Sequence, residues 1–151
     1  MASGSDHDIR VVNGLITTTI DSANGFERSA ENSDGTRFEQ TFLEFGAERR
    51  HSVARLEQHV TSLGGSPNND GSLKADLHRR FEDLRNAIGG GDKAVIEEVE
   101  RGEDYIKSKY ETALADDALS PATRAVVQEA FQSVKAGHDR ASQLKHSMQD
   151  Q

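Results

Sequence analysis

Apolar residues recur every three or four positions along most of this 151-residue chain, and that spacing constrains the fold more than any other feature. It turns apolar side chains onto one face of an α-helix, whereas no segment shows the alternation typical of a half-buried strand. Glycine-rich and polar interruptions divide the pattern into five runs. These runs cover about residues 8–32, 37–63, 72–88, 92–115 and 120–146. The sequence therefore predicts an all-α protein.

The interruptions also carry helix-end signals. Gly64 and Gly65 are suited to a C-terminal cap, and Ser120-Pro121 offers an N-cap serine followed by proline at the first helical position. Short connections make successive helices antiparallel. We therefore expect a single domain over residues 1–151, with an up-down-up-down four-helix bundle over about residues 8–115. The run at 120–146 would be an additional C-terminal helix that caps the bundle, packs along its side or pairs with a second subunit.

Composition excludes several classes of function. The formal net charge of −8 argues against a nucleic-acid surface, which needs clustered Lys and Arg, and equally against docking on anionic membranes. No run approaches the roughly 20 apolar residues needed to span a bilayer, and the polar N-terminal residues do not resemble a signal peptide. The chain has no cysteine, which fits a reducing compartment. We expect a cytoplasmic protein with no nucleic-acid or membrane partner.

Two charged residues occupy inward positions on apolar stripes. Arg49 follows Phe42 and Phe45 at helical spacing, and Glu103 follows Val99 in the same way. A buried charge costs several kcal/mol unless it is paired and hydrogen-bonded. The simplest solution is an Arg49–Glu103 ion pair across the bundle, because a guanidinium matches a carboxylate geometrically. Such a pair would set the register of the helices without any ligand.

The same two helical turns also contain potential metal ligands. Glu48 and His51 lie three residues apart, as do Glu100 and Glu103, so each pair shares a helix face. Ferritin-like bundles hold two metal ions with Glu-x-x-His motifs of this spacing. A hairpin around residues 34–35 brings Asp21 to the level of Glu48 and adds a fifth ligand. Because carboxylates dominate this set, iron or manganese suits it better than structural zinc.

These two interpretations give two classes of function. The favoured one is a non-catalytic bundle with a structural ion-pair layer, which associates with itself through the C-terminal helix or with another protein. The alternative is a metal-binding protein that stores iron or reacts with oxygen or peroxide. Arg49 favours the first class, because a cation next to the proposed site repels a metal ion. Gly102, next to Glu103, is expected to let a neighbouring helix approach closely.

Several of these motifs together resemble a known family. They are Asp21-Ser-Ala-Asn-Gly-Phe26, Glu48-Arg49 leading to Leu63-Gly-Gly65, Leu77-His-Arg79, and Glu100-Arg-Gly-Glu-Asp104 with Tyr110. The set resembles an uncharacterised bacterial domain family, found mostly in proteobacteria and grouped with the ferritin-like four-helix bundles. The resemblance covers roughly residues 8–115 and implies the fold but no activity, because the family is a domain of unknown function. In true di-iron bundles the second motif ends in His, whereas this chain has Glu103.

Overall fold

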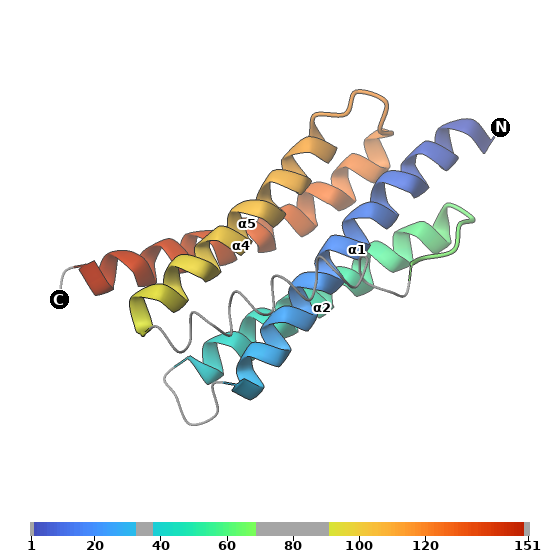
Figure 1. Cartoon of the computed structure of the whole chain (residues 1–151). Helices are drawn as coiled ribbons and strands as arrows, with labels where there is room; N and C mark the ends of the chain where they lie inside the picture. Colours follow the sequence, from blue (N-terminus) through green and yellow to red (C-terminus); the bar gives the residue numbers. More distant parts are fainter. Residues whose placement is uncertain (1, 33–37, 69–90, 150–151) are drawn as a thin grey trace.

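The structure, a computed structural model, describes residues 2–32, 38–68 and 91–149. Every regular element in these ranges is an α-helix, so the all-α prediction is confirmed for them (Figure 1). The helices are α1 (Ala2–Asn32), α2 (Glu39–Ser62), α4 (Asp92–Leu114) and α5 (Pro121–Gln149). The predicted helix over 72–88 lies outside the described residues. None of the helices described is both long and apolar enough to cross a membrane.

The four helices pack in a closed ring. α1 packs on α2, α2 on α5, α5 on α4, and α4 on α1. Neighbours in the ring run in opposite directions, while α2 and α4 run the same way (Figure 1). The described residues thus form a four-helix bundle, and the segment between α2 and α4 joins its opposite ends. The prediction that successive helices are antiparallel is confirmed for α1 with α2 and for α4 with α5.

The C-terminal helix α5 packs on α2 and α4 and forms one side of the ring made by the described residues. The predicted bundle over residues 8–115 includes the helix at 72–88, which lies outside the described residues, so the placement of α5 as an addition to that bundle stays a prediction. The inner face of α5 repeats every three or four residues and consists mostly of small residues. Those buried residues are Thr123, Val127, Ala130, Val134, Gly137 and Ala141. Alanine and glycine contribute little to a hydrophobic pattern, and the sequence therefore understated how fully this helix packs.

The apolar core divides into two clusters along the bundle axis. One contains Ile16, Leu56 and Val127 among its buried members, and the other contains Phe26, Phe42 and Phe45. Phe26 and Phe45 stack with their ring centroids 4.9 Å apart. Arg49 and Glu103 belong to neither cluster. They are positioned between the two by the helical repeat, so a polar layer separates the apolar halves of the core.

Both helix-end predictions are confirmed. α2 closes at Gly64, whose φ of 86° is readily adopted only by glycine. The Gly65 amide then donates to the Val60 carbonyl at 3.0 Å and the Gly64 amide to the Thr61 carbonyl at 3.0 Å, which together form a Schellman motif. α5 begins at Pro121, and the Ser120 Oγ accepts from the Thr123 amide at 3.3 Å.

Candidate functional site

The centre of the polar layer is an ion pair between α2 and α4. Arg49 Nη2 donates to Glu103 Oε2, as the sequence predicted. The exposed fractions of the two side chains are 0% for Arg49 and 1% for Glu103. Both charges are therefore buried away from water. In the protein interior an ion pair is screened least, and the loss of either partner costs most.

The rest of the guanidinium is only partly satisfied. Its Nε donates to the Ser22 Oγ of α1 at 3.1 Å. Its Nη1 is buried and has no hydrogen-bond partner in the described part of the chain. Arg49 thus links α2 to α1 through Ser22 and to α4 through Glu103. Three helices of the ring are tied together by one side chain.

The fourth helix closes over this pair at Gly137. A Cβ atom added to Gly137 would lie 2.7 Å from Glu103 Oε2 and 2.9 Å from Arg49 Nη2. Glycine is therefore required here by close approach, not by backbone conformation. The sequence interpretation missed Gly137 and assigned the close approach to Gly102. That assignment is wrong for the described residues, because a Cβ on Gly102 would meet nothing within 4 Å.

A second buried polar contact adjoins the pair. The Tyr110 hydroxyl of α4 and the Thr19 Oγ1 of α1 lie 2.8 Å apart, and Thr19 also donates to the Leu15 carbonyl at 2.6 Å. The Thr19 proton is thus used by Leu15, so Tyr110 is the donor between the two hydroxyls. Burial raises the pKa of Tyr110, with the Thr19 bond and the nearby Arg49 charge acting in the opposite direction. Tyr110 therefore stays neutral and contributes a hydrogen bond between α1 and α4.

The five predicted metal ligands are placed differently from one another. Glu48 and His51 are exposed on α2, Asp21 is half-buried on α1, Glu100 accepts from Lys145 at 3.0 Å, and Glu103 pairs with Arg49. Among the described residues, no three His, Asp or Glu side chains are grouped so that they could hold a metal ion. The structure thus does not assemble these ligands into a centre, and only Glu103 lies in the core.

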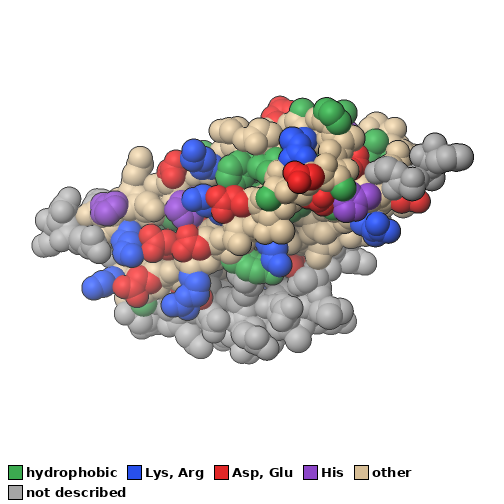
Figure 2. Space-filling model, turned by 90° about the horizontal axis from the view of Figure 1, so that it is seen from above, with side chains coloured by type: hydrophobic (Ala, Val, Ile, Leu, Met, Phe, Trp, Pro, Cys, Tyr) green, Lys and Arg blue, Asp and Glu red, His purple; other side chains and the backbone are tan. Residues whose placement is uncertain are grey.

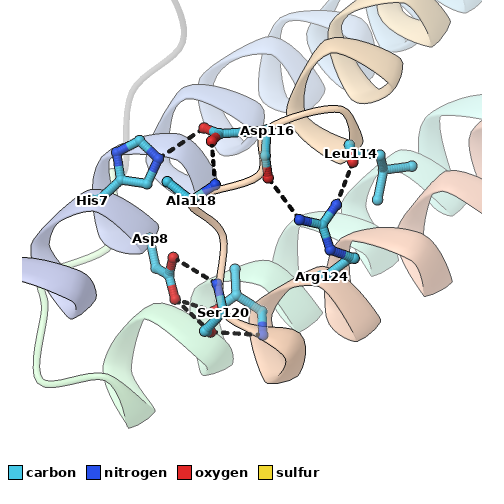
Figure 3. Close-up of polar contacts among 8 residues, drawn as sticks. His7, Asp8, Leu114, Asp116, Ala118, Ser120 and Arg124 are labelled. Carbon is cyan, nitrogen blue, oxygen red and sulfur yellow. Dashed lines mark hydrogen bonds and ion pairs between the residues drawn. The ribbon is translucent and has the colours of Figure 1, made fainter.

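A second polar junction lies near the N-terminal end of α1 (Figure 3). Asp8 is 2% exposed, and its Oδ2 accepts from the Ser120 Oγ at 2.6 Å and from the Thr123 Oγ1 at 2.8 Å. Thr123 Oγ1 also lies 2.7 Å from His59 Nε2 of α2. Both hydroxyls therefore share Asp8 Oδ2 as their acceptor. The junction joins α1 and α2 to the start of α5.

The α4–α5 turn is closed next to this junction. Arg124 donates to the carbonyl of Leu114 and, at 2.6 Å, to that of Asp116 (Figure 3). The Asp116 side chain accepts from the Ala118 amide at 2.9 Å and contacts His7 Nε2 at 2.8 Å. The turn therefore has hydrogen bonds to both α1 and α5, and its geometry is set from both sides.

Replacement of Asp8 with asparagine is expected to lower stability and flatten its acid dependence. Burial alone raises the pKa of Asp8, but the bonds from Ser120 and Thr123 outweigh it and lower the pKa below 3.8. A carboxyl whose folded pKa is lowered stabilises the fold above the ordinary pKa, and this contribution is lost as pH falls through the folded value. We expect a loss of about 1–3 kcal/mol at neutral pH. Urea unfolding at pH 7 and near pH 3 measures both effects.

The control for Asp8→Asn is Asp117→Asn, on the exposed turn. Equal pH dependence of unfolding in the Asp8 variant and the natural chain would show that this carboxylate does not stabilise the fold.

A family model matches residues 8–116 and is described as a domain of unknown function, DUF2383. This match covers most of the chain. The protein belongs to the DUF2383 family. No curated protein matches it. The match begins at Asp8 and ends at Asp116, so α5 and Gly137 lie beyond the DUF2383 match although they complete the ring around the ion pair.

Proposed function

We propose that this DUF2383 protein is a non-catalytic helical bundle whose Arg49–Glu103 pair sets the register of its helices. The observation that carries the proposal is the complete burial of both charges between two apolar clusters. Sliding one helix by a turn would set a charge against the aromatic or aliphatic cluster, at a cost of several kcal/mol. Buried polar groups are best attested in this role of specifying one register among several.

The competing proposal is a ferritin-like metal protein. Its support is the direction of the described helices, because α2 ends at the opposite end of the bundle from the start of α4. Two helices that a ferritin-like bundle joins by its one long connection are related in the same way. The donor chemistry favours the structural proposal. Of the five predicted ligands, Glu103 alone is buried, and its charge is already neutralised by Arg49. We also propose a cytoplasmic location, for which the lack of cysteine is the support.

A metal titration separates the two proposals. Anaerobic addition of iron(II), and separately manganese(II), to the full chain is expected to give no saturable binding and no change in melting temperature. A ligand that binds only the folded state must stabilise it, by about 2.7 kcal/mol at a hundredfold excess over Kd. Binding of about two ions per chain with a raised melting temperature would instead establish the ferritin-like function. Glu103→Gln is the matched variant, because it would remove the inward ligand and abolish such binding.

A further inference from the structure

We propose that α5 is a separable helix held in a charge-matched groove between α2 and α4, and that it exchanges between two copies of this chain. In the resulting dimer each α5 would occupy the groove of the other copy. This inference concerns self-association and does not depend on the role proposed for the ion pair.

The rim of the groove is matched to α5 in charge, and charged side chains of both signs crowd the face of the molecule seen in Figure 2. Three acidic residues of α2 and α4 face three basic residues of α5 over its C-terminal half. The pairs are Glu44 with Arg140 at 2.6 Å, Glu100 with Lys145 at 3.0 Å, and Asp104 with His138 at 2.5 Å. Nearer the start of α5 the signs reverse, because Arg55 of α2 pairs with Glu129 of α5. A helix entering in the opposite direction would set Glu129 against the acidic end, so the groove selects a helix with the charge order of α5 itself.

The residues on the inner face of α5 are also compatible with its exchange between two copies. Its buried residues are no larger than valine, and Gly137 sits against the ion pair. At the edges of this face Phe131 and Leu144 also pack on the core, and the Phe131 ring centroid lies 6.4 Å from that of Tyr110. The rim pairs are partly exposed, and each contributes at most about 1 kcal/mol. All these interactions, including those of Asp8 with Ser120 and Thr123, re-form when α5 comes from a second copy. Exchange of an identical element is a low-cost route to a dimer for this reason.

Only the α4–α5 turn must change conformation for exchange. In the structure Arg124 closes that turn by donating hydrogen bonds to the carbonyls of Leu114 and Asp116. The bond to Asp116, within the turn, is lost when the turn opens and α5 extends away from α4, whereas the bond to Leu114 at the end of α4 is made again by Arg124 of the second copy. Arg124 therefore holds α5 within its own chain, and its replacement is expected to favour the exchanged dimer.

Charge reversal on the full chain tests the exchange. One variant reverses the groove (Glu44→Arg with Glu100→Lys), and a second reverses the helix (Arg140→Glu with Lys145→Glu). In each variant alone, the groove and the helix of the same chain carry like charges. In an exchanged heterodimer the reversed groove holds the reversed helix and the natural groove of the other variant holds the natural helix. Both grooves are then matched in charge, whereas each monomer and each homodimer is mismatched. We expect native mass spectrometry of the mixture to show a heterodimer in at least about tenfold excess over either homodimer. The chain with all four changes is the control, because it is matched internally and gives no such excess.

A second variant tests the turn without altering the groove. Arg124→Ala in the natural chain is expected to raise the dimer fraction about tenfold at a given concentration, measured by light scattering after size exclusion. The proposal is supported by a heterodimer excess in the first experiment. It is also supported by a dimer of the Arg124 variant that becomes a heterodimer when Arg124→Ala is added to both charge-reversed variants and the two are mixed. If the mixed variants give no heterodimer and the Arg124 variant shows no such dimer, α5 does not exchange and the proposal is wrong.

Discussion

Replacing Arg49 with methionine is expected to lower the free energy of unfolding by about 3–5 kcal/mol. Methionine fills a similar volume but leaves the Glu103 carboxylate in the core without its partner. The space over that carboxylate is closed by Gly137, so water gains no access to replace the missing ion pair. Glu103→Leu should have a loss of the same order, because it leaves the buried guanidinium with only its bond to Ser22. Urea unfolding of each variant measures these losses.

The double variant decides whether these losses arise from the pair. Arg49→Met combined with Glu103→Leu removes both charges together, and it is expected to recover most of the stability lost by either single change. Arg50→Met is the matched control, since Arg50 is the next residue on α2 and pairs with Glu27 on the surface at 2.9 Å. Its loss should stay within about 1 kcal/mol. Single changes at Arg49 and Glu103 no more costly than this control would contradict the register role.

The sequence predicted the ion pair because periodicity identifies which face of a helix a residue occupies. Arg49 and Glu48 are adjacent, yet Arg49 continues the stripe of Phe42 and Phe45 and is buried, whereas Glu48 is exposed. The spacing of Glu48 and His51 shows only that they share a face. It does not indicate whether that face is inward, and the structure places it outward. The apolar stripe therefore predicted the pair correctly, whereas the motif alone predicted ligands that do not converge.

Contacts between distant segments were not predictable in the same way. Asp8 lies more than one hundred positions from Ser120 and Thr123, and nothing near Asp8 indicates those partners. The Ser120-Pro121 cap was predicted from local chemistry, but the carboxylate that accepts the Ser120 hydroxyl proton belongs to Asp8 of α1. Gly137 was missed for a related reason. A glycine within a helix does not reveal what lies opposite it, and only the packing of α5 over α4 and α2 makes it necessary.

Substitution of Gly137 by alanine is expected to destabilise the protein by about 1–3 kcal/mol, although the same change usually favours a helix. The propensity gain is about 1 kcal/mol. It is outweighed because the new Cβ lies 2.7 Å from Glu103 Oε2, a separation that forces the ion pair or the helix to move. Gly102→Ala on α4 is the control. Its Cβ would meet no described atom within 4 Å, and it should stabilise by about 1 kcal/mol.

The Gly137 effect can be assigned to the ion pair by repeating it without the charges. In the Arg49→Met, Glu103→Leu background the Cβ meets flexible apolar side chains, which can adjust more readily than a paired carboxylate and guanidinium. We therefore expect Gly137→Ala to cost less there than in the natural chain, a coupling measured by unfolding all members of the cycle. An equal cost in both backgrounds would place the clash with Phe45, whose Cε1 lies 3.3 Å from the added Cβ, and not with the ion pair.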